Sequence, residues 1–533
     1  MKFRYIKGKN FKDFVIIEDI HTVKDFQLYE VIKKVLYRKE YNPFIKGTFN
    51  KTIEYSYLFN DYIFPMQFWI DVKKQLSAFL NNEFTEDKLT LINDPYISGE
   101  YKTIDRKFFN EWLEQQEIPE DISIDDFKYI YQRDGVFEAI NNRTSRVEIA
   151  TSGGKTFITY LYCKYLLNHV IEPDKKILVI VPSQLLCTQL KRDFANYDIL
   201  QNDDKKIVVE TIFSGAKKVL NARVVCGTYH SLCKNEEDYF DDFSVMICDE
   251  LHRAKAYSIR GEIYSKMNQC QYIFGMTGTF PEYKTLDYLH IVAMFGHETV
   301  KVTAKELIDL GVANPIKIEQ IKISYKTEDE KPVETVYDLI KDLFIKDELC
   351  DEKDIKTIVG TDKYALEKLY YQNNKHRTNI ISKFINKFEH NSIIFVNTVE
   401  YCETLYRLLS ENCPERKISM IHGKIKKRDD ILDEMRNTPK KYVLVCTMDT
   451  MGTGISIKNL VNGYIVDCGK ADKKIRQALG RLMRLLEDKP DSRIFDFFDD
   501  VKWSIFRKHA RERERIYRTQ KFPIKTYTTT IPK

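Results

Sequence analysis

Short apolar runs alternate with longer segments of helical periodicity between about residues 145 and 300. The runs are RVEIA (146–150), KILVIVP (176–182), KIVVETI (206–212), ARVVCGT (222–228), SVMICDE (244–250) and QYIFGMT (271–277). Apolar strands that alternate with helices of this length form parallel sheets with helices on both faces. The pattern therefore predicts an α/β domain.

The same alternation recurs between about residues 390 and 500. Its apolar runs are NSIIFVN (391–397), RKISMIHG (416–423), KYVLVCT (441–447), NGYIVDC (462–468) and SRIFDFF (492–498). A chain of 533 residues is too long for one hydrophobic core. The fold class we predict is α/β, with two tandem parallel-sheet domains.

The remaining segments differ from these two domains in pattern. Aromatic, strand-like runs at 52–59 and 61–68, followed by a helical segment at 68–80, predict a small N-terminal α+β domain over 1–105. We place the α/β domains at 106–310 and 311–500, with a charged helical insertion at 326–377 in the second. A basic helix or tail follows at 501–533.

The charge is uneven along the chain. Residues 1–60 contain 12 Lys and Arg against 7 Asp and Glu, and residues 501–533 contain 10 against 2, whereas the part between them carries a net charge of −8. Basic ends suggest contact with a polyanion, and a solvated basic surface is the alternative. In the C-terminal helix, pairing of Arg with Glu at four-residue spacing competes with phosphate binding by Arg507, Lys508, Arg511 and Arg518, and we expect Trp503 to pack in the core.

The cysteines and the N-terminus indicate the compartment. The 11 cysteines are scattered without Cys-x-x-Cys spacing, which excludes the usual paired-cysteine zinc and redox sites and favours a reducing cytoplasm. Lysines interrupt the N-terminus before an apolar stretch of signal length forms, and no run of about 20 apolar residues occurs. We expect no membrane segment.

The stretch ATSGGKT (150–156) has the composition of a phosphate-binding loop. Ser152, Gly153 and Gly154 are small enough for successive backbone N–H groups to converge on phosphates, and a helical run follows. Lys155 would contact the β- and γ-phosphates and Thr156 would ligate Mg²⁺. The first glycine of the full phosphate-loop pattern is replaced by Ile149, so an ordinary flexible turn remains the alternative.

Two further groups of charged residues complete a candidate ATP site. The apolar run FSVMICDELH ends in Asp249, a candidate Mg²⁺ ligand, and Glu250, a candidate general base for the attacking water, although such a pair also caps helices. In QALGRLMR (477–484), spacings of four and three place Gln477, Arg481 and Arg484 on one helical face. Two arginines from a separate domain would be arginine fingers; a surface or salt-bridged role is the alternative.

These stretches, in this order, resemble motifs of superfamily 2 helicases and translocases: ATSGGKT (motif I), DELH at 249–252 (motif II), TGT at 277–279 (motif III), TMGTGISI at 450–457 (motif V) and QALGRLMR (motif VI). Weaker similarities are VPSQLLCTQL at 181–190 (motif Ia), GTYHSL at 227–232 (motif Ib) and IIFVNTVE at 393–400 (motif IV). The resemblance implies two RecA-like domains of the P-loop NTPase type that bind ATP and Mg²⁺ between them.

The resemblance also implies residue roles. Gln132, Gly452 and Gly454 would help to bind the nucleotide, and His252 with Thr277, Gly278 and Thr279 would couple hydrolysis to nucleic-acid contacts. The nucleic-acid backbone would lie against Pro182, Ser183, Gln184, Gly227, Thr228, His230, Thr447 and Thr453.

A closer resemblance is to the UvsW-type phage recombination helicases, carried by motifs II, V and VI and by residues 42–76. It implies an ATP-dependent DNA helicase that unwinds or branch-migrates forked and recombination intermediates in the host cytoplasm. Recombination or replication proteins would be its partners, and we expect a monomer. The alternatives are an RNA or RNA–DNA hybrid helicase, a nucleotide-gated nucleic-acid clamp without unwinding, and the motor subunit of a nuclease whose catalytic residues lie on another chain.

Overall fold

The computed structural model describes residues 1–7, 12–41, 52–80, 91–95, 103–119, 129–213, 221–254, 257–283, 285–340, 352–425, 427–451, 457–467, 469 and 472–533. The chain divides into two compact units. The first unit comprises Met1–Ala150 and Gly154–Val302, and the second comprises Thr303–Lys533 together with Thr151–Gly153.

A seven-stranded sheet forms the centre of the first unit. Its strands lie in the order β13 (Glu298–Val302), β7 (Thr144–Ile149), β12 (Tyr272–Thr277), β11 (Phe243–Asp249), β8 (Lys176–Val181), β10 (Val224–Thr228) and β9 (Val209–Ile212). All six neighbouring pairs are parallel. This confirms the predicted parallel sheet, to which the structure adds β13 as an edge strand.

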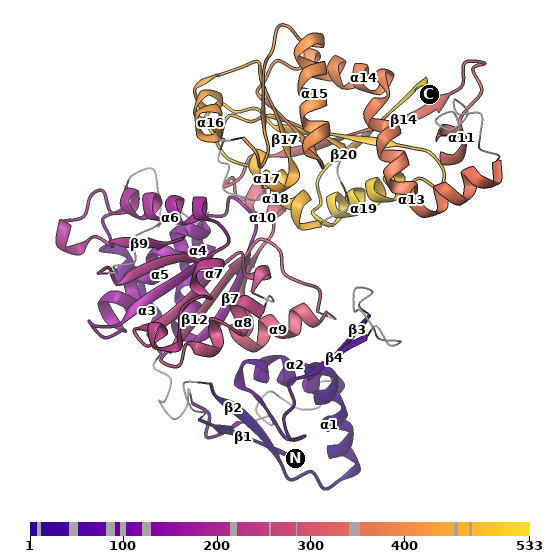
Figure 1. Cartoon of the computed structure of the whole chain (residues 1–533). Helices are drawn as coiled ribbons and strands as arrows, with labels where there is room; N and C mark the ends of the chain where they lie inside the picture. The colour runs from indigo at the N-terminus through magenta and orange to yellow at the C-terminus, as the bar shows by residue number, and fades with distance from the viewer. Residues whose placement is uncertain are drawn as a thin grey trace. The chain divides into compact units, whose positions relative to one another are not determined.

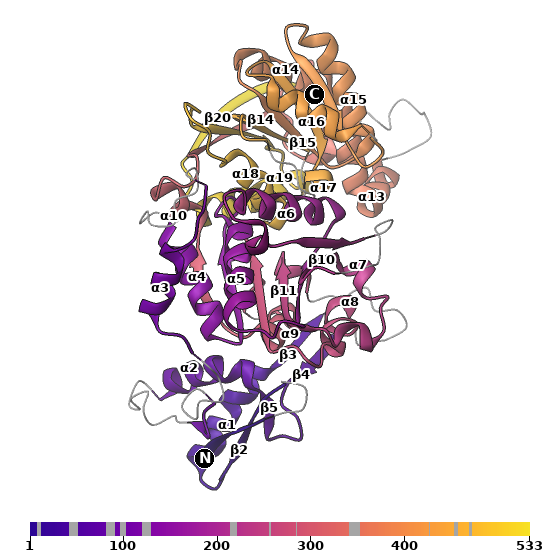
Figure 2. The same ribbon diagram turned by 90° about the vertical axis from the view of Figure 1, so that its left-hand side faces the viewer.

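Helices cover this sheet. They are α3 (Arg106–Glu114), α4 (Ile130–Asn141), α5 (Lys155–His169), α6 (Gln184–Tyr197), α7 (Tyr229–Leu232), α8 (Tyr257–Arg260) and α9 (Leu286–Phe295). Figure 2 shows α4 and α5 in front of the sheet. In α5, ten consecutive residues from Phe157 to Leu166 are buried, so this helix is covered on all sides rather than along one stripe.

The N-terminal part of the first unit is α+β, as predicted. Its four-stranded sheet has the order β5 (Ile63–Pro65), β2 (Phe14–Glu18), β1 (Lys2–Ile6) and β6 (Leu91–Ile92). The helices α1 (Val23–Leu36) and α2 (Trp69–Phe79) accompany it, and β3 (Tyr37–Tyr41) pairs with β4 (Thr52–Ser56) as a separate ribbon. Side chains of α9, including Leu289 and Val292, belong to the same buried cluster as this part, so it packs directly on the first α/β sheet's helix layer.

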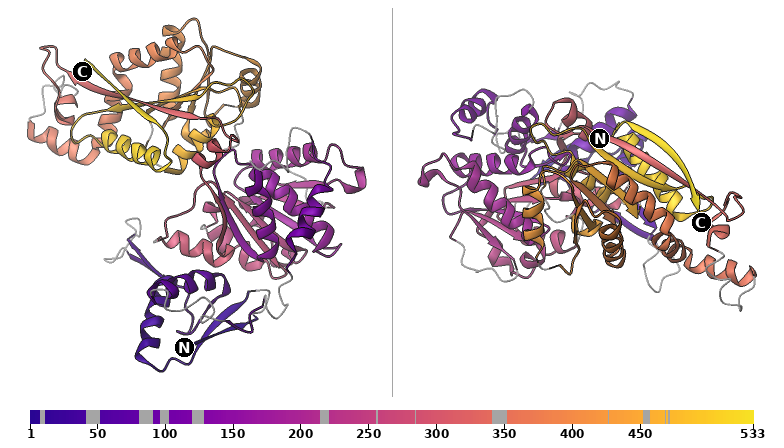
Figure 3. Two further views of the ribbon diagram at one scale, coloured as in Figure 1. Left: turned by 180° about the vertical axis from the view of Figure 1, so that it is seen from behind. Right: turned by 90° about the horizontal axis from the view of Figure 1, so that it is seen from above.

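The second unit contains another seven-stranded parallel sheet. Its order is β16 (Lys417–Ile421), β17 (Tyr442–Thr447), β15 (Ser392–Val396), β18 (Asn462–Asp467), β19 (Ser492–Asp499), β14 (Ile316–Lys326) and β20 (Ile524–Pro532). Figure 3 shows the two long strands β14 and β20 running side by side to the C-terminus. The chain end, expected as a basic helix or tail, thus adds an edge strand to this sheet.

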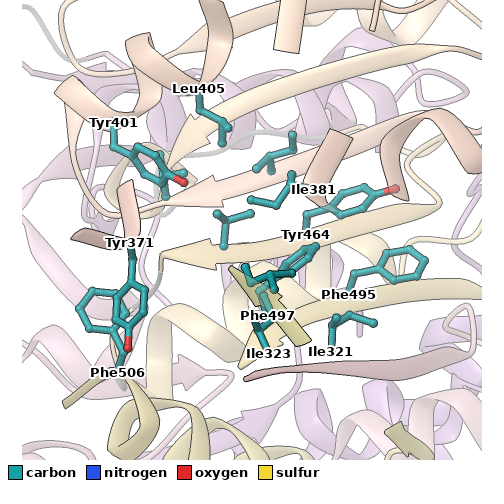
Figure 4. Packing of buried hydrophobic residues seen from close by; sticks show 14 of the residues in the cluster. Ile321, Ile323, Tyr371, Ile381, Tyr401, Leu405, Tyr464, Phe495, Phe497 and Phe506 are labelled. Carbon is teal, nitrogen blue, oxygen red and sulfur yellow. The ribbon is translucent and has the colours of Figure 1, made fainter. Parts of the chain in front are cut away.

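Helices also surround the second sheet. They are α10 (Ala304–Asp309), α11 (Val336–Ile340), α13 (Glu352–Asn373), α14 (Lys375–Lys387), α15 (Val399–Asn412), α16 (Arg428–Asn437), α17 (Met448–Met451), α18 (Asp472–Leu482) and α19 (Ile505–Thr519). The core between sheet and helices is aromatic. Figure 4 shows Tyr371 of α13 beside Phe506 of α19, and Phe495 and Phe497 on β19 pointing into the same cluster. The charged segment predicted as an insertion therefore contributes to this core.

Two sequence expectations for the C-terminal segment have different outcomes. Arg518 pairs with Glu514 at 2.6 Å within α19, at the expected four-residue spacing, whereas Arg513 pairs at 2.6 Å with the buried Asp496 of β19. The expectation that Trp503 packs in the core is wrong, because Trp503 is 65% exposed. A turn with positive φ at Trp503 directs the side chain away from the core, and turns of this kind leave no periodic signal in the sequence.

Among the described residues, no helix is both long enough and apolar enough to cross a membrane.

Candidate nucleotide and nucleic-acid site

The phosphate-loop sequence lies between β7 and α5, as its pattern predicted. Gly154 is the N-cap of α5 in the left-handed conformation, with φ 77°, and Ser152 also has a positive φ of 75°. The Lys155 ammonium donates hydrogen bonds to the carbonyls of Ile149 at 2.9 Å and Ala150 at 3.4 Å. The loop therefore curves around the lysine head group and presents the N-terminus of a 15-residue helix, the geometry that favours anions.

Gln132 lies against this loop. It sits on α4, is 7% exposed, and its Nε2 is hydrogen-bonded to the Tyr131 hydroxyl at 3.3 Å. A Cβ atom added at Gly154 would lie 2.2 Å from Gln132 Nε2. Gly154 is thus required twice, for its backbone conformation and for the close approach of Gln132. The structure brings together these two residues, which are 22 positions apart in the chain.

The predicted acidic pair lies at the carboxyl end of β11, the same edge of the sheet as the loop after β7. The Glu250 N–H donates to Asp249 Oδ1 at 2.9 Å, and Glu250 has a positive φ of 52°. Burial, and then the adjacent Glu250 carboxylate, raise the pKa of Asp249 to about 6, while the Lys155 ammonium acts in the opposite direction. A strained backbone and a perturbed carboxyl pKa are both common at functional sites.

His252 connects the acidic pair to the next strand. Its Nδ1 lies 3.3 Å from Glu250 Oε2 and 3.1 Å from the Thr277 hydroxyl at the end of β12. The Thr277 hydroxyl donates its proton to the Thr279 carbonyl at 2.9 Å, so the contact with His252 requires the proton on Nδ1. The predicted coupling residues of motifs II and III are therefore in direct contact, and Gly278 spans the turn between the two threonines.

The candidate nucleic-acid residues of motifs Ia and Ib follow two neighbouring strands. Val181 of β8 pairs with Thr228 of β10, so 182–184 and 228–230 lie at the same edge of the sheet. Ser183 caps α6, because its hydroxyl accepts from the Leu186 N–H at 3.4 Å. Pro182 and Gln184 flank it, and Gln184 and His230 are exposed whereas Thr228 is buried.

Gly227 has a packing role in addition to any contact with nucleic acid. It is buried within β10, and a Cβ atom there would lie 2.8 Å from Leu232 Cγ. In the second unit, the buried Thr447 at the end of β17 has its hydroxyl 2.6 Å from that of Thr450. Gly452, Thr453 and Gly454 lie outside the described residues.

Gln477 and Arg481 lie on α18, one turn apart, as predicted. The helix ends at Leu482, so Arg484 belongs to the following turn rather than to the same helical face. The physical reason is that side chains satisfy the carbonyls at the helix end. The Leu482 carbonyl accepts from Lys489 Nζ at 2.7 Å and from the Ser492 hydroxyl at 2.9 Å.

The same turn is held by two residues that the sequence analysis did not identify. Lys489 Nζ also donates to the Arg484 carbonyl at 2.9 Å, and the Asn314 N–H donates to the Met483 carbonyl at 2.6 Å. Burial, and then the nearby Arg484 guanidinium, lower the pKa of Lys489 to about 7. A lysine shortly after a helix end is the signal that could have indicated Lys489, whereas Asn314 is 169 positions from Met483 and gives no local signal.

The residues suited to Mg²⁺ are oxygen donors, which this hard cation prefers. Thr156 follows Lys155 at the start of α5, and Asp249 is within electrostatic range of Lys155. The raised pKa of Asp249 reflects a partly buried carboxylate next to the Glu250 carboxylate, whose charge Lys155 offsets in part, and a bound cation would stabilise the ionised form. The donor set of the first unit therefore fits a magnesium ion.

Two protein families match this chain. Residues 104–282 match the family described as "Type III restriction enzyme, res subunit", and residues 374–485 match "Helicase conserved C-terminal domain". The two matches lie on the two seven-stranded sheets, so each unit corresponds to one of the paired motor domains.

Individual proteins also match this chain. The chain is 27% identical over 448 residues to the ATP-dependent DNA helicase UvsW of Enterobacteria phage T4. The aligned region covers 80% of this chain and 82% of the phage protein. The crystal structure of T4 UvsW covers 99% of this chain and all of its own, with a TM-score of 0.44 and 23% identity. A fragment of a putative HsdR subunit from Vibrio vulnificus YJ016 matches 84% of this chain and 75% of its own, with a TM-score of 0.54 and 15% identity, which supports the fold.

Fold and site together define a P-loop ATPase with two tandem RecA-like domains. Within that class, the family matches and the relatives make the chain similar to superfamily 2 helicases and to T4 UvsW, and they support an ATP-hydrolysing helicase.

Proposed function

We propose that this helicase is a DNA motor that uses ATP and Mg²⁺ to unwind or branch-migrate forked and recombination intermediates. The observation that carries the proposal is the arrangement of Lys155, Asp249 and Glu250 at one edge of the first sheet, with Glu250 linked through His252 to Thr277. The choice of DNA is supported by the similarity to UvsW, whose name describes a DNA helicase. On the same basis, the host cytoplasm is the proposed location.

In the first unit, each residue has a proposed role. Lys155 leaves the loop carbonyls and binds the β- and γ-phosphates, while the N–H groups of 152–156 bind the phosphate oxygens. Thr156 and Asp249 hold Mg²⁺, which neutralises charge on the phosphates when it is bound. Glu250 orients the attacking water and accepts its proton. Gln132, next to the loop, reads the adenine edge.

In the second unit, Arg481 and Arg484 are the proposed arginine fingers, and Gln477 lies one turn before Arg481 on α18. Guanidinium groups stabilise the charge that develops on the transferred phosphoryl group, a contribution of about 10³ to 10⁵ in rate in related systems. Lys489 and Asn314 fix the turn that carries Arg484 by binding its neighbouring carbonyls. The nucleotide would draw the two units together, and hydrolysis would release them.

The proposed DNA path runs along the carboxyl ends of the strands. In the first unit it follows Pro182, Ser183, Gln184 and the 227–230 segment, and in the second Thr447 and Thr453 are the proposed contacts, while Gly452 and Gly454 are proposed to bind the nucleotide. Hydroxyls, amides and backbone N–H groups bind phosphates without reading sequence. His252, Thr277, Gly278 and Thr279 then couple closure at the nucleotide to movement at this edge.

An unwinding assay tests the proposal. The purified full-length chain is incubated with forks, D-loops, four-way junctions, an RNA duplex and an RNA–DNA hybrid, with and without ATP. We expect ATP-dependent separation of the branched DNA substrates and loss of it in Glu250→Gln. The control is Glu262→Gln, because Glu262 is a half-buried partner of Lys266 and has no role in the proposed chemistry.

The other functions predict different results in the same assay. Separation of the RNA substrates without the DNA substrates would identify an RNA helicase. ATP-dependent binding without strand separation, together with equal ATP turnover in the parent and Glu250→Gln, would identify a nucleotide-gated clamp. Shortened DNA products would indicate a nuclease.

A further inference from the structure

Trp503 differs from the two other tryptophans of the chain. Trp69 and Trp112 are 6% and 7% exposed, whereas Trp503 is 65% exposed. Its backbone also has a φ of 63°, in the left-handed region that bulky residues rarely adopt. A glycine or asparagine would adopt this turn with less strain, so neither folding nor solubility accounts for a tryptophan here.

The backbone on both sides of Trp503 is fixed. The Lys502 N–H donates to the Glu334 carbonyl at 3.0 Å, and its own carbonyl accepts from the Val336 N–H at 3.0 Å. On the other side, the buried Ser504 hydroxyl donates to the Glu367 carboxylate at 2.7 Å. Trp503 is therefore held rigidly in its exposed position, as a preorganised binding group requires.

A second aromatic ring and an ammonium group accompany Trp503. Its ring centroid lies 6.1 Å from that of Tyr337 on α11, at an interplanar angle of 64°. Lys363 Nζ on α13 lies 5.5 Å from the Tyr337 ring centroid and also donates to the Trp503 carbonyl. Figure 1 shows that α11 and α13 lie at the same end of the second unit. We call Trp503, Tyr337 and Lys363 the aromatic platform.

Helix α13 links this platform to the proposed DNA path. Tyr364, the residue after Lys363, accepts a hydrogen bond at 3.4 Å from Asn397 Nδ2, and Asn397 directly follows β15 in motif IV. The Tyr364 ring stacks on Phe506 of α19, with centroids 5.6 Å apart and planes at 21°. One helix therefore contacts both the platform and the carboxyl edge of the second sheet.

We propose that the aromatic platform stacks on an unpaired base of single-stranded DNA. Every base has a π face that an exposed indole can stack on, and the ammonium of Lys363 attracts the adjacent phosphates. A protein partner is less suited, because the charged side chains of Lys502 and Glu334 adjoin the exposed indole. The proposal rests on the proposed function, since it assigns a new contact to the same DNA strand.

Tryptophan fluorescence tests the platform directly, because Trp503 is the one exposed tryptophan of the three. Oligo(dT) is titrated into the full-length protein while tryptophan emission is recorded, and binding of a labelled oligo(dT) is measured in parallel by anisotropy. We expect quenching in the parent and in Trp112→Phe, and its loss in Trp503→Phe. Trp503→Ala should weaken oligo(dT) binding by about tenfold, the effect of losing one base stack.

Trp503→Gly separates a binding role from a structural one. It removes the strained side chain, so we expect an unchanged or higher Tm together with weaker oligo(dT) binding. Quenching that persists in Trp503→Phe, or parental affinity in Trp503→Ala and Trp503→Gly, would overturn the platform while anisotropy still supports DNA binding. Absence of any anisotropy change in the parent would overturn the proposed DNA function and the platform with it.

Discussion

The Arg38 guanidinium donates hydrogen bonds of 3.2 and 3.0 Å to the Tyr283 carbonyl and stacks on the Tyr283 ring, 4.9 Å from its centroid. Arg38 lies on β3 of the N-terminal part, and Tyr283 lies four residues after Thr279 of motif III. The 7% exposed Arg38 also donates to three carbonyls at the end of α1. One side chain thus joins the N-terminal part to the segment that follows the coupling residues.

Arg38→Ala should destabilise this junction. Removal of the guanidinium leaves several carbonyls in a buried setting without a donor, and we expect a loss of about 2–4 kcal/mol in the free energy of unfolding. Urea denaturation measures it. Arg4→Ala is the matched control, because Arg4 pairs with Glu18 at the surface and should matter little. Equal urea midpoints for Arg38→Ala and Arg4→Ala would contradict a stabilising role of Arg38 at this junction.

Gly154→Ala should impair ATP binding through two separable effects. The left-handed φ costs about 1 kcal/mol or more for alanine, and the new Cβ displaces Gln132 from the loop. Gly311→Ala is the control, because Gly311 has a φ of 69° with nothing within 4 Å of the added Cβ. We expect both variants to lose stability and Gly154→Ala alone to lose ATP affinity, measured by calorimetry. Parental ATP affinity in Gly154→Ala would be inconsistent with the loop assignment.

Thr277→Val should separate ATP hydrolysis from strand separation. The valine keeps the shape but removes the hydroxyl that contacts His252 and the Thr279 carbonyl. We expect ATP hydrolysis to persist, while the number of base pairs separated per ATP hydrolysed falls by about tenfold. This is the size of effect expected when a buried polar contact is lost. Thr299→Val is the control, because the Thr299 hydroxyl donates to the Arg146 carbonyl at 3.2 Å and has no role in the proposed coupling. Parallel losses of hydrolysis and unwinding would argue against a coupling role.

Stability should depend on pH through His290 of α9. Burial, and then Arg260, lower the pKa of His290 to about 4, and Tyr57 bonds its Nδ1 at 3.1 Å. Because the folded pKa is below the unfolded value of about 6.5, the unfolded state binds the proton more readily. The contribution of the neutral His290 to the free energy of unfolding is complete above about pH 6.5. It is lost as the pH falls toward 4, and the total loss is about 3 kcal/mol.

Urea denaturation at pH 7 and pH 5 measures this effect. His290→Gln should lose less stability between the two pH values than the parent, whereas His21→Gln should behave as the parent because the His21 side chain is 79% exposed. Identical pH dependence in His290→Gln and the parent would show that this histidine does not control the acid response.

The sequence predicts most of both sheets because their strands are buried on two faces and read as continuous apolar runs. The strands it missed lie at or next to an edge. β14 (Ile316–Lys326) and β20 (Ile524–Pro532) alternate apolar with charged or hydroxyl residues, which also suits a surface segment, and they pair across about 200 positions. Their pairing depends on tertiary contacts that no local pattern encodes.

The site shows the same division. The phosphate loop and acidic pair have local signatures, because a turn, a strand end and a helix start must follow one another in the chain. Asn314 binds the Met483 carbonyl after α18, which only the folded chain brings near it, whereas Lys489 follows the same helix end closely in the sequence. Trp503 has no such signature, because Val501 and Phe506 near it in the sequence are buried while Trp503 itself is exposed at a turn with a positive φ.

The central claim is that the second unit supplies arginines to a nucleotide bound by the first. The most direct test is ATP hydrolysis by Arg481→Ala at saturating ATP and DNA, with ATP affinity measured on the same preparation. The account predicts a fall in kcat of about 10³ or more with ATP affinity largely retained. A kcat equal to that of the parent would contradict it.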